Sequence, residues 1–478
     1  MLRRCAQARL LLTKKSSPCI IGGSILSKYV PYVDYQASNV EWIGETPKHW
    51  WKSKLKFEAH INMGQSPSSD DCNQDGIGLP FLQGNAEFGR LYPIPKQYCA
   101  VAKKTSEKGE ILFSVRAPVG AINLADQAYG IGRGLCSISP SGLTKDFLWW
   151  AAIVFKTELV SVSTGSTFEA VSAEQVENLL LFRPPIDEQN AIAAFLNHET
   201  AKIDTLIEKQ QQLIKLLKEK RQAVISHAVT KGLNPDAPIK DSGVEWLGEV
   251  PEHWSVVPLR HITPEVTVGI VVTPAKYYVD NGIPCFRSLN VKENSIEERD
   301  FVYISKASNS DLMKSQVFQG DILVVRSGQP GKAAVVLAKH DSYNCIDLII
   351  IRKSKKIISD FLCYQINSDV CKKQISSGSG GAIQQHFNVE LAKGLYVTFP
   401  PLEEQMEISK YIMKQIQAFD SLVKKAEMSI DLMKERRSAL ISAAVTGKID
   451  VRNWKPQPSA DKQQKTMTES ATTAPATH

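Results

Sequence analysis

The sequence predicts an α+β protein in which two mixed α/β domains alternate with two long helices. Three repeated segments lead to this prediction. VEWIGETPKHW at 40–50 returns as VEWLGEVPEHW at 244–254, PPIDEQ at 184–189 returns as PPLEEQ at 400–405, and LKEKRQAVISHAVT at 217–230 returns as MKERRSALISAAVT at 433–446. The offset between the copies is far longer than the roughly 20–50 residues of a solenoid repeat. The chain is therefore a duplicated half-molecule.

The first 27 residues are basic and contain no acidic residue. Such a composition is typical of an organelle transit peptide, whereas the apolar run is too short and broken for a secretory signal. A third interpretation is a wrongly chosen upstream start codon, with the protein beginning near Ser27, and this is the one we favour. We therefore expect residues 1–27 to be a disordered extension or a misassigned start.

Net charge gives no evidence of a nucleic-acid partner. The chain has 57 basic and 50 acidic residues, and six of the basic ones precede the first acidic residue, Asp34. Without those six the chain is close to neutral, so any basic surface must come from segregation of charge. The nine cysteines include no C-x-x-C pair, which argues against a zinc ribbon and favours reduced thiols in the cytoplasm.

The two mixed domains are expected at 28–185 and 244–401. Short β-type runs occur at 111–116, 321–327 and 333–338, and helical patterns at 147–159 and 358–366. The Pro, Asp and Gly residues of 232–243 mark a linker. The polar C-terminal stretch, 448–478, is expected to be a disordered tail.

The long helices are expected at 186–231 and 402–447. Each follows a Pro-Pro pair and ends near a glycine, Gly232 or Gly447, as helices commonly do. The predicted apolar seams have heptad spacing, with Arg437 at a skipped position of the second; they comprise Ile192, Leu196, Ile203, Leu206, Leu213, Leu217, Val224 and Ala228 in the first helix, and Ile412, Ile416, Phe419, Val423, Ala426, Ile430, Met433, Leu440 and Ala444 in the second. We expect the helices to pair with each other; the alternative is that each packs on its own domain.

The sequence contains no complete motif for catalysis or cofactor binding. RSGQPGKA at 326–333 contains Gly-x-x-Gly-Lys, but a P-loop needs four residues between the glycines and Ser or Thr after the lysine, so a tight turn is the better interpretation. His49 and His253 of the repeated His-Trp pair have no second ligand at metal spacing and are interpreted as structural. We therefore expect no catalytic residue, bound metal or bound cofactor in this chain.

Polar and Gly-rich stretches of the two domains are the candidate DNA-binding loops. Arg side chains suit guanine, and Asn or Gln side chains suit adenine, although each residue has the alternative of an ordinary solvated loop. The candidate DNA-binding residues are Gln65, Ser66, Gln83, Asn85, Arg90, Arg116, Arg133, Ser166, Thr167, Arg287, Asn290, Arg326, Ser327, Gln329, Lys332, Gln384, Gln385 and His386. We expect Arg116 and Arg326 to end equivalent strands in the two halves.

The chain resembles the specificity subunit of a type I restriction–modification enzyme. The resemblance covers about 28–454 and rests on the repeated phrases above, together with GEILFSVRAPVG at 109–120 and GDILVVRSGQPG at 320–331. It implies two target-recognition domains and two helices that pair antiparallel as a spacer, giving a pseudo-two-fold chain. Because DNA strands are antiparallel, such a chain can meet two half-sites with equivalent groups, and because the domains differ, the half-sites should differ.

The resemblance also implies partners. Methylation and cleavage would belong to two modification subunits that use S-adenosylmethionine and to restriction subunits that use ATP and Mg²⁺, while double-stranded DNA is the target. Two alternatives remain open: a methyltransferase or nuclease fused to recognition domains, which needs a cofactor motif, and a coiled-coil scaffold without a DNA role.

Overall fold

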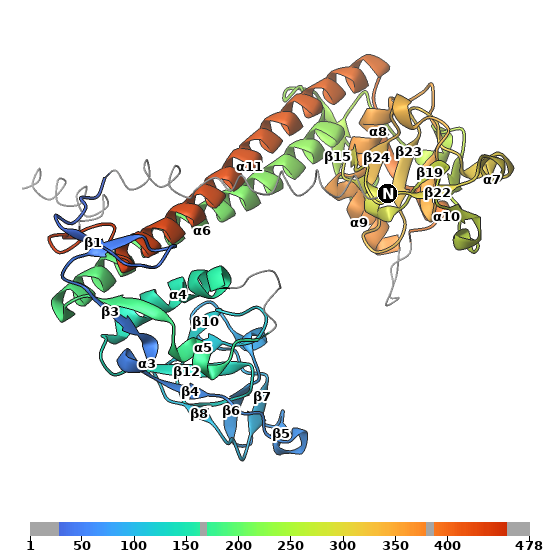
Figure 1. Ribbon diagram of the computed structural model, residues 1–478. Helices are drawn as coiled ribbons and strands as arrows, with labels where there is room; N and C mark the ends of the chain where they lie inside the picture. The colour runs from blue at the N-terminus through green and yellow to red at the C-terminus, as the bar shows by residue number, and fades with distance from the viewer. Residues whose placement is uncertain (1–27, 163–169, 379–386, 457–478) are drawn as a thin grey trace, which may run out of the picture. The chain divides into compact units, whose positions relative to one another are not determined.

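The computed structural model describes residues 28–162, 170–378 and 387–456. The chain divides into two compact units, one of residues 1–208 and 429–478 and the other of residues 209–428 (Figure 1). Both long helices, α6 (Ile186–Lys231) and α11 (Leu402–Val445), contribute to both units. The predicted α+β class is confirmed, but each unit contains one mixed domain together with part of each helix.

The two larger sheets of unit 1 pack against each other across β9 (Ile111–Ser114), which is buried on both faces. Ile111 and Phe113 point into the main core with α4 (Lys145–Val162), whereas Leu112 packs with Leu82 and Ile131 of the second sheet. The four-stranded sheet has the order β10 (Ile122–Leu124), β9, β12 (Leu135–Pro140), β4 (Ala59–Met63); the five-stranded sheet has the order β5 (Cys72–Asn73), β7 (Gln97–Cys99), β6 (Leu79–Leu82), β11 (Tyr129–Ile131), β8 (Thr105–Ser106).

Unit 2 repeats this plan around β23 (Ile322–Val325), whose side chains alternate between two cores in the same way. One sheet has the order β17 (Val266–Val268), β26 (Leu348–Ile351), β23, β24 (Ala333–Val335); the other has the order β18 (Tyr278–Val279), β22 (Val302–Ile304), β19 (Ile283–Phe286), β25 (Asn344–Cys345). Helix α8 (Ser359–Ile366) packs on β24.

The remaining elements frame the two domains. The helices are α3 (Leu55–Glu58) and α5 (Ala173–Glu177) in unit 1, and α7 (Lys306–Asp311), α9 (Asp369–Gly378) and α10 (Val389–Gly394) in unit 2. Two-stranded pairs are β1 (Tyr35–Ala37) with β2 (Glu45–Pro47), β3 (Trp51–Lys54) with β13 (Leu180–Arg183), β14 (Ile239–Asp241) with β15 (Glu249–Pro251), β16 (Ser255–Pro258) with β27 (Tyr396–Phe399), and β20 (Val291–Lys292) with β21 (Ser295–Ile296).

The long helices pair with each other, as predicted. In unit 1 the Arg437 Nε lies 2.9 Å from the Asp204 Oδ1, and in unit 2 the Arg221 Nη1 lies 2.8 Å from the Asp420 Oδ1. The two ion pairs join equivalent positions of the repeat, and their order along the helices is antiparallel. Arg437 is thus accommodated at its seam position because Asp204 of the partner helix forms an ion pair with it.

The predicted seam of α6 is wrong at two positions. Leu206 and Leu213 are 50% and 44% exposed, whereas the neighbouring Ile207 and Ile214 are half-buried. Steps of three and four residues from Ile203 lead through Ile207 and Ile214, so a seam with unbroken heptad spacing passes one residue beside the predicted leucines. In α11 the predicted seam is confirmed, since every member is buried or half-buried.

The repeated phrase secures the start of each long helix. The Trp50 Nε1 donates to the Glu188 Oε2 at 2.6 Å, and the His49 Nε2 lies 3.0 Å from the same carboxylate. The second copy repeats this arrangement, with the Trp254 Nε1 2.7 Å from the Glu404 Oε2. The predicted structural role of the His-Trp pair agrees with these contacts.

The prediction of a disordered tail is wrong for residues 448–456. Ile449 and Val451 are buried in the core of unit 1, and the Asp450 N–H donates to the Val30 carbonyl at 2.8 Å. A side chain at Gly447 would collide with Pro47 and lie 3.2 Å from Trp50, as one at Gly232 would lie 3.2 Å from Trp254. The C-terminal end of the second repeat therefore packs against the first copy of the repeated phrase, residues 40–50. Residues 1–27 and 457–478 lie outside the described residues.

Candidate nucleic-acid interface

In unit 1, the loop segments that follow β4, β6, β9 and β11 converge where the two larger sheets meet. The Gly64 N–H donates to the Leu135 carbonyl and the Gln65 N–H to the Ile131 carbonyl, both at 2.9 Å. The Gly132 N–H donates to the Leu82 carbonyl at 2.8 Å. These bonds place the turn after β4, the segment after β6 and the connection from β11 to β12 side by side. A side chain at Gly64 would collide with the Gly132 carbonyl, so this convergence requires a glycine there.

Five predicted residues gather on these segments. The Ser66 Oγ accepts from the Gln83 Nε2 at 2.9 Å and from the Arg133 N–H at 3.2 Å. Gln65, Gln83 and Arg133 are exposed, and the exposed Arg116 follows β9, where the adjacent Val115 N–H bonds to the Gly134 carbonyl. We call Gln65, Ser66, Gln83, Arg116 and Arg133 cluster 1. It combines two guanidinium groups with amide and hydroxyl groups, which are the side chains that hydrogen-bond to base edges and phosphates.

Two other predicted residues of unit 1 lie apart from this set of contacts. Asn85 begins a 3₁₀ turn, in which its carbonyl accepts from the Phe88 N–H at 3.1 Å. Arg90 forms an ion pair with Glu208 of α6, and both side chains are exposed. Ser166 and Thr167 lie outside the described residues.

Unit 2 builds the same convergence from different side chains. The Gly269 N–H donates to the Leu348 carbonyl, the Ile270 N–H to the Cys345 carbonyl, and the Ile346 N–H to the Phe286 carbonyl, each at 2.8 Å. Gly269 therefore occupies the place of Gly64. The backbone bonds that hold the loops are shared by the two units, while the residues between them differ.

Asp347 is central to the side chains of this second site. Its Oδ1 lies 3.0 Å from the Arg326 Nη1, and its Oδ2 accepts from the Ser327 Oγ at 3.2 Å. Val271 and Val272 of the adjoining loop are 45% and 71% exposed. We call Val271, Val272, Arg326, Ser327 and Asp347 cluster 2. Exposed methyl groups can contact the thymine methyl, and the carboxylate offsets the charge of Arg326.

Sequence reasoning missed Asp347 and the two valines. The prediction rested on Arg, Gln, Asn and Ser side chains, and not on an alignment of the turns that follow Gly64 and Gly269. Alignment of GQS at 64–66 with GIV at 269–271 would have indicated Val271. No local signal marks Asp347, since its role depends on its contact with Arg326 across the sheet.

The expected equivalence of Arg116 and Arg326 is wrong by one residue. Ser114 pairs with Leu135 and Val325 with Leu348 at the ends of matching strand pairs, so Val115 occupies the place of Arg326. The carbonyls of Val115 and Arg326 accept equivalent backbone bonds, at 2.8 and 3.1 Å. Neighbouring strand residues point to opposite faces, and the two arginines therefore belong to different positions of the framework.

Asn290 has a framework role instead of the predicted one. It is fully buried, and its Nδ2 donates to the carbonyls of Glu297 and Arg299 at 3.1 and 2.7 Å. A side chain in this state cannot reach a base edge. The Asn290 Oδ1 also accepts from the N–H of Arg287 at 2.9 Å, while the Arg287 guanidinium donates to the Asp300 carbonyl.

The other predicted residues of unit 2 have varied surroundings. Gln329 is exposed in the turn before β24. Lys332 lines a hollow of about 460 Å³ together with Arg221 and Asp420 of the long helices, and no residue of cluster 2 lines this hollow. Gln384, Gln385 and His386 lie outside the described residues.

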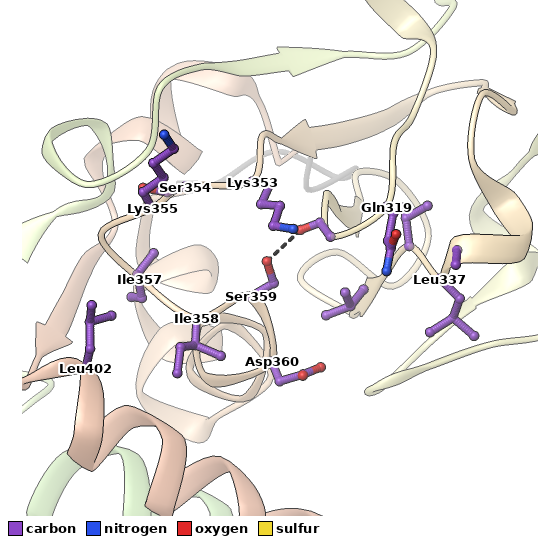
Figure 2. Close-up of a pocket in the computed structure, with 14 residues that line it drawn as sticks. Gln319, Leu337, Lys353, Ser354, Lys355, Ile357, Ile358, Ser359, Asp360 and Leu402 are labelled. Carbon is purple, nitrogen blue, oxygen red and sulfur yellow. Dashed lines mark hydrogen bonds between the residues drawn. The ribbon is translucent and has the colours of Figure 1, made fainter.

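A further hollow of about 440 Å³ lies at the start of α8 in unit 2 (Figure 2). Lys353, Lys355 and Asp360 line it, and the Ser359 Oγ donates to the Gly320 carbonyl at 2.6 Å. Burial raises the pKa of Asp360. None of the predicted DNA-binding residues lines this hollow.

The described part of the chain shows neither a metal-binding cluster nor a membrane-spanning helix. Among those residues no group of three or more His, Cys, Asp or Glu side chains is arranged to hold a metal ion. No helix there is long and apolar enough to cross a membrane. Burial raises the pKa of the Cys136 and Cys371 thiols to about 12, which keeps both protonated at neutral pH.

The chain is similar in sequence to known DNA specificity proteins. The family model described as type I restriction modification DNA specificity domain matches residues 47–216. The protein of Methanocaldococcus jannaschii named as the MjaX specificity subunit is 39% identical over 185 residues, which cover 37% of this chain and 43% of that protein. The EcoBI specificity subunit of Escherichia coli is 24% identical over 84% of this chain and 86% of its own length.

A solved structure shares the fold. Its description reads: structural basis underlying complex assembly and conformational transition of the type I R-M system. The matching chain of that structure has a TM-score of 0.65 and is 16% identical in sequence. The match covers 84% of this chain and 99% of that one.

Proposed function

Because the chain belongs to the DNA specificity subunits of type I restriction–modification enzymes, we propose that it reads an asymmetric, bipartite target in double-stranded DNA. Cluster 1 would contact one half of the target and cluster 2 the other. The observation that carries this proposal is the shared convergence of loops in the two units, with different side chains on each.

Different chemistry on one framework is what an asymmetric target requires. Cluster 1 contains Arg116 and Arg133, and cluster 2 contains Arg326 bound to Asp347 beside two exposed valines. Arg side chains suit guanine and phosphates, whereas exposed methyl groups suit thymine. The two clusters are therefore expected to prefer different base sequences.

Methylation and cleavage would be carried out by partner subunits, so this chain would have no catalytic role. The proposal rests on the relatives, which are named as specificity subunits of type I restriction enzymes. The modification subunits would use S-adenosylmethionine, and the restriction subunits ATP and Mg²⁺. Label transfer from S-adenosylmethionine by the purified chain alone would contradict this division.

Gln83 of cluster 1 and Arg287, which follows Phe286 at the loop convergence of unit 2, offer a matched test of the two sites. Each directly follows the strand that pairs in parallel with β11 or β25, so they occupy equivalent places. Gln83→Ala should relax the sequence preference in one half of the target and Arg287→Ala in the other, each by about 1–3 kcal/mol for a base contact. The Lys332→Ala variant, which changes a residue beside the long helices, serves as the control.

The measurement is selection of bound sequences from a random duplex library by the purified chain, followed by mapping of methylated sites in cells that express the complete complex. A target without two separate parts would contradict the proposal. So would variants that alter both halves together. Absence of salt-dependent binding to random duplex DNA would instead support a scaffold without a DNA role.

A further inference from the structure

Unit 2 has an open groove between the two long helices. Tyr411 of α11 lies on one side, and Lys220, Val224 and His227 of α6 lie on the other, around a volume of about 490 Å³. A second hollow of about 340 Å³ shares Gly232 and Leu233 with the first and extends to Glu404, Glu407 and His253. We call the two together the helix groove. It is apolar at Tyr411 and Leu233, basic at Lys220 and Lys231, and acidic at the two glutamates.

The matching positions of unit 1 are covered. Phe195 corresponds to Tyr411, because each lies seven residues after the helix-start glutamate of its repeat. Phe195 is fully buried, whereas Tyr411 is 38% exposed. Leu440 and Ala443, which correspond to Val224 and His227, are also buried. The same helix surface is therefore core in one unit and open in the other.

Residues from both ends of the chain cover the surface in unit 1. The rings of Tyr29 and Trp454 each meet Phe195 edge to face, with 5.3 Å between centroids. The Arg452 Nε lies 3.4 Å from the Glu188 Oε1, and its guanidinium lies over the Tyr32 ring at 5.0 Å. Two aromatic rings thus cover the apolar part of this surface, and one guanidinium group pairs with its carboxylate.

Among the residues that the structure describes, none covers the corresponding groups of unit 2 in this way. Glu404 contacts His253 and Trp254, but its side chain remains 37% exposed, against 4% for Glu188. Glu407 adds a second, exposed carboxylate where the first repeat has Ala191. An aromatic ring on Tyr411 and a cation near the two carboxylates would complete the groove, by the chemistry that closes its counterpart.

We propose that the helix groove binds a segment of a partner protein that carries an aromatic side chain and, within a few residues, an arginine. The Arg452-Asn453-Trp454 sequence of this chain shows the spacing that the unit 1 surface accepts. Because Lys231 of the groove pairs with Glu249 at 3.1 Å, the carboxylates of Glu404 and Glu407 favour a cationic side chain beside them. This interaction goes beyond recognition of DNA, and its test contains no DNA.

The probe is a fluorescent peptide with the sequence of residues 446–456, TGKIDVRNWKP, titrated into the full chain and followed by fluorescence anisotropy. We expect saturable binding that weakens at least about fivefold in Tyr411→Ala, since aromatic contacts dominate such anchors. Glu407→Ala, which restores the residue type of the first repeat, should weaken binding less and reduce its salt dependence. Met413→Ala is the matched control, because Met413 is 49% exposed on the same helix but lines a different hollow.

Peptides in which the arginine or the tryptophan is replaced by alanine should each bind more weakly than the parent. Equal binding to the parent chain and to Tyr411→Ala, or no binding at all, would overturn the proposal. Two further outcomes would also overturn it by assigning the groove to another occupant. Peptide binding only after removal of residues 1–27 would assign it to that segment, and a dimer that Tyr411→Ala abolishes in sedimentation would assign it to a second copy.

Discussion

Replacement of Glu188 by alanine should destabilise unit 1 more than the matched Glu404→Ala destabilises unit 2. Both carboxylates accept from the tryptophan of the repeated phrase, at 2.6 Å for Trp50 and 2.7 Å for Trp254. Only Glu188 is nearly fully buried and also faces Arg452 of the C-terminal segment, at 3.4 Å. The two substitutions therefore remove the same hydrogen bond in different surroundings.

The expected magnitudes follow from burial. In either variant an indole N–H in a core position loses its acceptor, which costs about 1–3 kcal/mol. Breaking a buried ion pair costs about 3–5 kcal/mol, but Arg452 is 46% exposed, so the lower part of that range applies. We expect a total near 3–4 kcal/mol for Glu188→Ala. For Glu404→Ala we expect about 1–2 kcal/mol, since its ion pair with the half-exposed His253 contributes little.

Hydrogen–deuterium exchange with mass spectrometry is the suitable assay, because it reports on each unit separately and two units need not unfold as one. Glu188→Ala should raise exchange at 40–58 and at 446–456, while 244–262 stays unchanged. Glu404→Ala should raise exchange at 244–262 alone, and by less. Equal effects of the two variants, or protection at 446–456 that does not respond to Glu188→Ala, would refute the role given to burial and to Arg452.

Three other predictions concern pH, pairing and DNA affinity. Burial raises the pKa of Glu158 to about 7 from 4.5, so its contribution to stability should be lost as pH rises from about 4.5 to 7; Glu158→Gln should raise the melting temperature at pH 8 but not at pH 4, and an equal gain at both would contradict this. A double-mutant cycle of Arg437→Ala and Asp204→Ala should give a salt-sensitive coupling of about 0.5–1 kcal/mol, because both groups are about a third exposed; a coupling unaffected by 1 M salt would argue against it. Asp347→Ala should free Arg326 and steepen the salt dependence of random-duplex binding by about one unit of slope; the Kd measured from 50 to 200 mM salt checks this, and an unchanged slope would remove Arg326 from the interface.

The repeat was the strongest signal in the sequence. It predicted the α+β class, the two long helices and their pairing, because heptad spacing and helix stop signals are local properties of the chain. It also indicated that the His-Trp pair is framework, since both copies retain it. The seam of α6 was predicted less well: Leu206 and Ile207 are both apolar, and only the position of the partner helix selects Ile207.

The candidate interface could be predicted only in part for the same reason. The sequence indicated Gln65, Gln83 and Arg133 because polar residues in Gly-rich loops are visible in one dimension. It could not distinguish them from Asn290, whose amide is fully used inside the fold.

By itself, the sequence determined that the molecule is duplicated and where its two long helices lie along the chain. Only the tertiary structure decided which residues complete each copy. Ile449 and Val451 of the C-terminal segment enter the core of unit 1, although they stand far along the chain from the members that residues 32–203 contribute. Strand register, burial and contacts between distant segments depend on how the whole chain packs, and no pattern of neighbouring residues contains that information.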